Sequence, residues 1–180
     1  MQKNQIRKKI IKYKKIKNLK NLQPNLNILF QLLKKKKIKK KVLGSYFPVN
    51  FEIDTFQIMQ KLKEKGFILS LPIIKKKNYM DFYKWDLNEP LYINKYGIPE
   101  PKKKHKLIPS VILIPLVAFD KNLNRLGYGG GFYDRFLSKI EKFKILKIGL
   151  AFSSQKVKSI PINKFDKKMD YILTEKKLYK

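Results

Sequence analysis

The chain has 180 residues, and 43% of them are hydrophobic, which is enough to bury the core of one domain and too much for a disordered chain. Its 43 Lys and Arg residues outnumber 13 Asp and Glu residues and give a formal net charge of +30. The absence of cysteine excludes disulfides, thiolate metal sites and cysteine nucleophiles, and the single histidine argues against catalytic triads and histidine-rich metal sites.

Hydrophobic periodicity predicts helices and strands along the first half of the chain. Helices are expected over residues 3–20, 26–37 and 56–65. Strands are expected over residues 42–47, 67–71 and 80–85. Thr55 is the expected cap of the third helix, Gly66 its stop, and Pro72 the end of the second strand. Residues 86–109 contain four prolines and a lysine cluster around His105, and we expect a long loop there.

In the second half, residues 111–117 form a continuous apolar run that is typical of a strand covered on both faces. Further strands are expected over residues 145–151 and 171–174, and a helix over residues 133–142. Strands that alternate with helices indicate a single α/β domain of residues 1–180, Rossmann-like, with a mainly parallel central sheet flanked by helices. The longest apolar run contains Pro115 and is too short to cross a bilayer, so we expect a cytoplasmic protein without a membrane partner.

A glycine-rich segment lies between an apolar strand and the predicted helix at residue 133. Residues 124–135 read NRLGYGGGFYDR. Glycine lets the backbone take positive φ and approach a ligand closely, and successive N–H groups before a helix form an anion site. Arg125 is placed to add a guanidinium to bound phosphates, and Asp134 a carboxylate for Mg²⁺.

Two common nucleotide fingerprints are absent from this segment. Phe132 stands where the dinucleotide motif has its third glycine, and no Gly-Lys-Ser/Thr follows. The alternative interpretation is an ordinary glycine-rich turn, with Asp134 as a first-turn helix acid. Only Arg7, Arg125 and Arg135 are arginine in this lysine-rich chain, and an ammonium does not replace a bidentate guanidinium. Our hypothesis is that Arg7 and Arg125 contact phosphate or carboxylate.

The residues around the glycine segment resemble a known family. Residues 114–120 and 125–134 together resemble the signature of the 5-formyltetrahydrofolate cyclo-ligase (5,10-methenyltetrahydrofolate synthetase) family. Shorter resemblances follow in the family's order: Lys3 with Arg7, residues 46–48 and 52–55, residues 96–101, residues 149–152 with Gln155, then Ile160-Pro161, Asp166 and Thr174-Glu175. The resemblance covers nearly the whole chain.

The resemblance implies an ATP- and Mg²⁺-dependent ligase that converts 5-formyltetrahydrofolate into 5,10-methenyltetrahydrofolate, ADP and phosphate. In the implied mechanism, the formyl oxygen attacks the γ-phosphate, N10 attacks the activated formyl carbon, and phosphate leaves. Such chemistry needs positioning and charge neutralisation more than a protein nucleophile. No catalytic residue in the narrow sense is therefore expected, and Arg125 is the best candidate for electrostatic catalysis.

The resemblance also implies roles for individual residues. ATP would contact Lys3, Arg7, Arg125, Leu126, Gly127, Tyr128, Gly129, Gly130, Gly131, Phe132 and Tyr133. The folate would contact Phe47, Glu52, Tyr128, Gly129, Gly130, Gly131 and Phe132. Mg²⁺ would be held by Asp134 and Asp166. Trp85 and Tyr96 are further candidates for stacking on the folate, with packing in the core or at the rim as the alternative.

Some positions depart from the family pattern, and rival functions remain open. Leu116, Leu123, Ser110 and Phe165 replace residues usual in the family, which bears on loop conformation and rate more than on reaction class. A lysine-rich nucleic-acid-binding protein is one rival, although the accompanying Ile, Asn, Tyr and Phe favour AT-rich coding bias as the origin of the charge. A same-fold ATP-binding paralogue with an altered substrate is another. We expect a monomer, no dedicated nucleic-acid partner, and a substrate that carries one or several glutamates.

Overall fold

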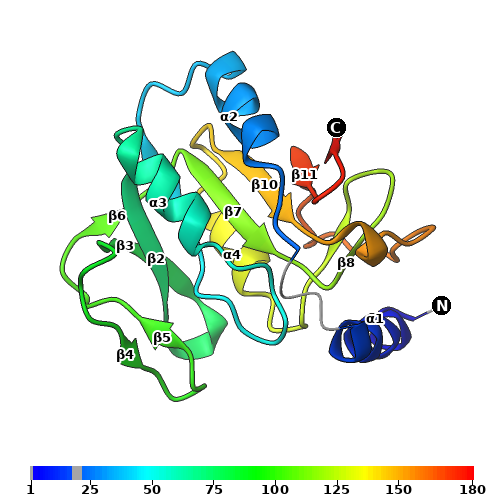
Figure 1. The fold of residues 1–180 in the computed structure, drawn as a ribbon. Helices are drawn as coiled ribbons and strands as arrows, with labels where there is room; N and C mark the ends of the chain where they lie inside the picture. The colour runs from blue at the N-terminus through cyan, green and yellow to red at the C-terminus, as the bar shows by residue number, and fades with distance from the viewer. Residues whose placement is uncertain (1, 18–21) are drawn as a thin grey trace.

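The computed structural model describes residues 2–17 and 22–180, and its main feature is an eight-stranded sheet between helices (Figure 1). Five neighbouring strands are parallel, in the order β2-β1-β7-β10-β11. Their bounds are Ile68–Ile74 for β2, Val42–Gly44 for β1, Val111–Pro115 for β7, Leu146–Leu150 for β10 and Tyr171–Leu173 for β11. The predicted α/β class with a mainly parallel central sheet is thereby confirmed.

Short antiparallel strands extend the sheet at both edges. The additions are β3 (Met80–Lys84) and β6 (Lys106–Leu107) beside β2, and β12 (Leu178–Tyr179) beside β11. Two separate two-stranded sheets are formed by β4 (Tyr92–Ile93) with β5 (Pro99–Glu100) and by β8 (Ala118–Phe119) with β9 (Arg125–Leu126). The predicted loop over residues 86–109 therefore contains β4, β5 and β6, whose two-residue lengths leave no periodic signal in the sequence.

Helices cover both faces of the sheet (Figure 1). α2 (Leu26–Lys35) and α3 (Phe56–Glu64) pack on one face, and α4 (Phe132–Lys139) packs on the other. α1 (Lys3–Lys17) lies beside β8, where Ile6 and Ile10 are buried against Val117 and Leu126. Two single 3₁₀ turns, η2 (Lys76–Asn78) and η3 (Ser153–Gln155), complete the helical elements described. The last predicted residues of the first helix, 18–20, lie outside the described residues.

Two local predictions were wrong. Thr55 occupies the N-cap position of α3, but its hydroxyl donates to Tyr46 O at 2.7 Å, while the carboxylate of Asp54 accepts from Phe56 N at 2.8 Å. Pro72 does not end β2, which continues to Ile74. β1 pairs with β2 only as far as Ser70, and beyond it β2 pairs with β3 alone. At Pro72 the strand is thus paired on one side, where a missing N–H is tolerated.

The connections of the parallel strands create a crevice at their carboxyl ends. β1 continues through α3 to β2, whereas its neighbour β7 continues through α4 to β10, on the opposite face. The connection after β1 and the connection after β7 therefore leave the sheet toward opposite faces. In open parallel sheets this reversal of strand order is the usual place for a ligand.

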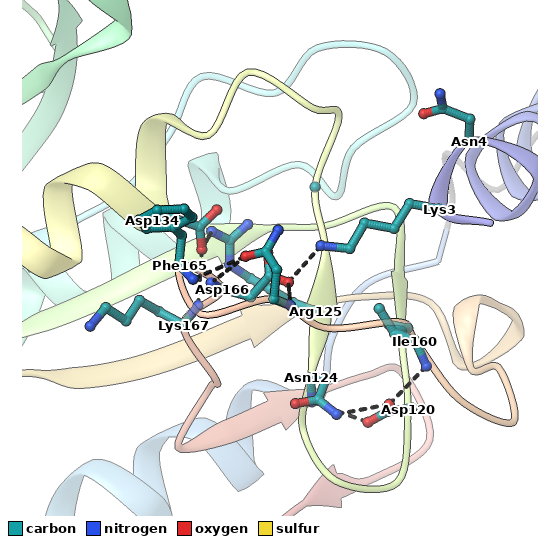
Figure 2. A network of polar contacts seen from close by, with 12 residues as sticks. Lys3, Asn4, Asp120, Asn124, Arg125, Asp134, Ile160, Phe165, Asp166 and Lys167 are labelled. Carbon is teal, nitrogen blue, oxygen red and sulfur yellow. Dashed lines mark hydrogen bonds and ion pairs between the residues drawn. The ribbon is translucent and has the colours of Figure 1, made fainter.

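A buried carboxylate holds the β8–β9 hairpin to the loop after η3 (Figure 2). Asp120 accepts hydrogen bonds from Asn122 N, Asn124 N, Asn124 Nδ2 and Ile160 N at 2.9 to 3.1 Å. Within this turn Leu123, one of the departures from the family pattern noted above, has a φ of 62°. The backbone thus keeps a left-handed conformation suited to glycine, at a cost on the order of 1 kcal/mol for a side chain.

We expect Asp120→Ala to lower the free energy of unfolding by about 3 kcal/mol, because it leaves several buried N–H groups without an acceptor. Urea denaturation followed by circular dichroism measures the change. Asp54→Ala is the matched control, since it removes an exposed helix cap worth about 1 kcal/mol. Equal losses in the two variants would contradict the structural role assigned to Asp120.

Candidate functional site

A cavity of about 1030 Å³ opens at the carboxyl ends of β1 and β7. Phe47 and Glu52 reach it from the chain after β1, Pro115 from the end of β7, and Lys3 and Arg7 from α1. The whole segment from Arg125 to Arg135 lines it, as does Asp166. The structure therefore brings every residue that the sequence assigned to ATP, folate or metal to one cavity.

The glycine loop forms one wall of this cavity between β9 and α4. Gly129 has a φ of 113°, and Gly131, which caps α4, has a φ of 65°. Both values lie in the left-handed region that favours glycine. The Arg135 guanidinium donates to Gly130 O and also to Asn78 O, the latter at 3.0 Å, so the loop is tied to η2. The sequence predicted the positive φ values but contained no signal for the contact with η2.

Helix α1 brings two cations to the loop. The Arg7 guanidinium donates to Gly127 O at 2.9 Å and to Asn4 Oδ1 at 2.6 Å. The Lys3 ammonium donates to Asp166 Oδ2 at 2.5 Å (Figure 2). Burial of Ile6 and Ile10 on the neighbouring turns anchors this helix. Residues more than a hundred positions apart in the sequence are thus joined by the docking of α1.

Arg125 and Asp134 form an ion pair that joins the two ends of the glycine loop (Figure 2). Arg125 Nη2 donates to Asp134 Oδ1 at 2.8 Å, and the arginine side chain is only 5% exposed. Its Nε is buried and has no hydrogen-bond partner among the described residues. An unsatisfied buried donor on a cation costs free energy, which an incoming anion would recover.

The two predicted metal ligands fit a magnesium ion shared with a substrate. Asp134 Oδ1 also accepts from Lys167 N at 3.1 Å, next to Asp166, so the two carboxylates belong to adjoining segments. Among the described residues, Asp134 Oδ2 and Asp166 Oδ1 accept no hydrogen bond, and no group of three or more His, Cys, Asp and Glu side chains is gathered as a complete metal site. Mg²⁺ is commonly held by one or two carboxylates plus substrate phosphates, which suits this pair.

Glu52 lies at the other predicted part of the site and is half-buried in the cavity wall. Its Oε2 accepts from Val49 N at 3.0 Å. Burial raises the pKa of the Glu52 carboxyl from 4.5 to about 7, against the lowering effects of that hydrogen bond and of Lys14. Lys14 is itself buried on α1, and burial lowers the pKa of its ammonium to about 8. Phe47 packs edge-on against Phe56, with ring centroids 5.5 Å apart.

The two stacking candidates do not line the cavity. Trp85 is buried in the core and donates its indole N–H to Glu89 O at 3.0 Å. Tyr96 is exposed and packs edge-on against Phe132, with centroids 6.4 Å apart. Trp85 is therefore a core residue, which was the alternative to stacking on the folate. It directly follows β3 and packs against Phe56 of α3.

Several cavity residues had no assigned role in the sequence. They come from β2, η2, the β4–β5 hairpin and the loop before Asp166, and include Ile74, Tyr79, Ile98, Glu100, Asn163 and Phe165. Phe165 is 66% exposed, and its position next to Asp166 was the only signal that it would reach the site. Ile98 and Glu100 belong to the motif of residues 96–101, and Asn163 lies close to Asp166, but neither motif assigned them a role. Ile74 and Tyr79 lie outside the motifs, and only the folding of β2 and β3 brings them here.

Comparisons with known proteins show the family of this chain. The sequence model of the 5-formyltetrahydrofolate cyclo-ligase family matches residues 1–175. The 5-formyltetrahydrofolate cyclo-ligase of Haemophilus influenzae is 35% identical over 133 residues, which are 70% of this chain and 71% of that protein. The Escherichia coli K12 enzyme of the same name is 31% identical over 135 residues, 71% and 74% of the two chains.

Solved structures show the same architecture. The 5,10-methenyltetrahydrofolate synthetase of Aquifex aeolicus superposes with a TM-score of 0.77 at 26% identity, covering 100% of this chain and 93% of that one. A Mycoplasma pneumoniae synthetase superposes with a TM-score of 0.71 at 24% identity, covering 97% and 99%, and is evidence for the fold alone. The chain belongs to the 5-formyltetrahydrofolate cyclo-ligase family, as its motifs predicted. No helix of the described residues is long and apolar enough to cross a membrane.

The raised pKa of Glu52 predicts a pH-dependent cost to stability. The native state keeps this proton up to about pH 7, whereas the unfolded chain releases it near its ordinary value of 4.5. Stability is therefore lost as the pH rises between these values, by roughly 3 kcal/mol. We expect Glu52→Gln to have little effect at pH 4 and to stabilise the protein at pH 8. Urea unfolding at both pH values checks this, and a variant that differs equally from the wild type at both would contradict it.

Proposed function

We propose that this chain catalyses the ATP- and Mg²⁺-dependent conversion of 5-formyltetrahydrofolate into 5,10-methenyltetrahydrofolate, with release of ADP and phosphate. The observation that carries the proposal is the shared cavity. The glycine loop, the neighbouring cations and carboxylates, and the pair Phe47 and Glu52 all line it. Membership of the cyclo-ligase family supports the same reaction.

In this proposal, ATP phosphates lie on the glycine loop. Lys3, Arg7 and Arg125 neutralise them, and the buried Nε of Arg125 gains an acceptor that the described residues do not provide. The guanidinium of Arg7 lies 3.6 Å from the place of a Cβ at Gly129, which is an ordinary contact, so Gly129 is favoured there by its positive φ and not by lack of space. Asp134 and Asp166 would hold Mg²⁺, which supplies positive charge to the phosphates when bound.

The folate lies on the opposite side of the loop in this proposal. Glu52 faces the pterin, since a carboxylate accepts paired N–H donors, and Phe47 offers an aromatic face. Residues Tyr128 to Phe132 contact the formyl group from the loop. The formyl oxygen then attacks the γ-phosphate, N10 attacks the formyl carbon, and phosphate leaves. The chain contributes positioning and electrostatic stabilisation, with Arg125 the central cation.

The assembly of these groups from one chain supports action as a monomer. The test is the ATP-dependent appearance of methenyltetrahydrofolate absorbance when purified protein is mixed with 5-formyltetrahydrofolate and Mg-ATP. Folded protein that yields no such signal would overturn the proposal. Nucleic-acid binding that survives at physiological salt, in a chain without this activity, would favour the nucleic-acid alternative instead.

We expect Asp134→Asn to lower kcat by about 100-fold or more, because the amide removes a metal ligand and the partner of Arg125. The absorbance assay measures kcat, and circular dichroism checks that the variant is folded. Asp170→Asn is the control, since Asp170 pairs with Lys147 and does not line the cavity. An Asp134→Asn variant with normal turnover and normal Mg²⁺ dependence would exclude Asp134 from the metal site.

We expect Arg7→Lys to raise the KM for ATP about tenfold, because an ammonium cannot reproduce the planar, multidentate contacts of the guanidinium. Initial rates at saturating folate measure this KM. The control is Lys9→Gln, which removes a positive charge from α1. Lys9 lies on the exposed side of the helix, so this variant should leave the KM unchanged. An unchanged KM in Arg7→Lys would show that Arg7 serves only to dock the helix.

A further inference from the structure

Lys14 is a buried cation on the inner side of α1. It lies on the same stripe of the helix as Ile6 and Ile10, and these three are the buried residues of α1. Lys14 is 2% exposed, and its ammonium lies 5.7 Å from the centre of the Phe152 ring. It takes part in none of the ion pairs within 4.0 Å among the described residues. Removing an ammonium from water is costly, so the burial of Lys14 indicates an opposite charge near it.

The opposite charge is the carboxylate of Glu52. Phe152, just after β10, packs in one hydrophobic cluster with Tyr46 and Ile53, and Ile53 directly follows Glu52 in the chain. Lys14 therefore lies beside the segment that brings Glu52 to the cavity. Glu52 raises the pKa of the Lys14 ammonium, and Lys14 in turn lowers the pKa of the Glu52 carboxyl. The two charges thus stabilise each other, although of the pair only Glu52 lines the cavity.

The backbone around Glu52 is fixed by a tight turn. Glu52 N donates to Val49 O at 3.0 Å, and Glu52 Oε2 accepts from Val49 N at 3.0 Å. The central residues Asn50 and Phe51 have φ values of 49° and 63°, as in a type I′ turn. The Tyr128 hydroxyl donates to Asn50 O at 3.0 Å and joins this turn to the glycine loop. Because the turn sets the direction of the side chain, the charge of Glu52 is the property that can vary.

The other titratable groups around Glu52 are phenols. They are Tyr46 on the chain after β1, Tyr128 in the glycine loop and Tyr133 in α4. Burial is the main cause that raises the pKa of each phenol above 10.0, and the charge of Glu52 adds to it. The phenols therefore stay neutral below that pH. Among the described residues, Lys14 is the cation that acts on Glu52.

We propose that Lys14 is a positioning residue of the folate site, whose charge keeps Glu52 as a carboxylate, the form that accepts two N–H donors of the pterin. This inference rests on the proposed function, because it takes the pterin as the ligand of Glu52. Loss of water around Glu52 acts against the carboxylate, and a bound folate removes more water. The ammonium of Lys14 opposes this effect from α1, outside the cavity.

The first test measures the charge of Glu52 without substrate. Carbon-13 NMR of glutamate-labelled protein follows the titration of the carboxyl groups, and the signal that is missing in Glu52→Gln identifies Glu52. We expect Lys14→Met to raise the pKa of Glu52 from about 7 to about 8, because the opposite charge is removed. Lys15→Met is the matched control, since it removes an exposed charge from the next position of α1 and should leave this pKa unchanged.

The second test follows the binding of 5-formyltetrahydrofolate without ATP, by isothermal titration calorimetry between about pH 6 and pH 9. The wild type should bind more tightly as the pH rises through about 7, where Glu52 loses its proton. In Lys14→Met this rise should move to about pH 8. The variant should then bind about fivefold more weakly than the wild type at pH 7 and equally well at pH 9. Lys15→Met should follow the wild type throughout.

Stability separates this role from a purely structural one. Burial lowers the pKa of Lys14 to about 8, so its charge opposes folding below that pH. We expect Lys14→Met to unfold at a higher urea concentration than the wild type at pH 7, because methionine fills the position without a charge. A lower urea midpoint, with folate affinity reduced equally at every pH, would assign Lys14 to the packing of α1 and overturn the proposal.

Two further outcomes would also overturn it. They are an unchanged pKa of Glu52 in Lys14→Met, and folate-binding profiles that coincide in this variant and the wild type. Methenyl absorbance tests the reaction separately. A protein that shows the Lys14-dependent change in both NMR and calorimetry but forms no methenyl product would retain this role and refute the reaction. A protein that forms product, with coincident binding profiles, would retain the reaction and refute this role.

Discussion

The ion pair between Arg125 and Asp134 connects the hairpin, the glycine loop and α4, and the geometry of the site depends on it. Arg125 begins β9, the hairpin strand before the loop, and Asp134 lies in the first turn of α4, so their contact closes the loop between them. Arg125 is too buried to be satisfied by solvent, and its Nε has no partner among the described residues. The pair therefore holds the loop in shape and keeps a cation ready for an anion.

The docking of α1 is the second requirement of the site. Few contacts bind this helix to the rest of the chain, and they centre on Ile6, Ile10 and the hairpin. Two of its cations, Lys3 and Arg7, reach Asp166 and the glycine loop. Hydrophobic docking thus positions these two half-buried cations at the site.

The charge of the chain divides into a diffuse part and an organised part. Most lysines are exposed and contribute to a general positive field. The lysines around Asp81 differ. Lys75, Lys106 and Lys139 share its buried carboxylate, and Lys75 and Lys139 line a cavity together with Lys76. A sequence count treats all of these residues alike, whereas the sheet register that places Asp81 on β3 between β2 and β6 separates them.

The sequence by itself determined the fold class, the family and part of the lining of the main cavity, because periodicity, glycine placement and motif order can be read along a chain. It did not determine the extent of β2 past Pro72, the burial of Trp85 or the cap of α3, because these depend on which strand or carbonyl lies next to the residue. Only the tertiary structure showed that Glu52 is half-buried in the cavity wall and that Lys139, which pairs with Asp81, lines the same cavity. Packing decides which side chains lose contact with water and which charges from distant elements lie together. The order of residues along the chain does not specify this packing.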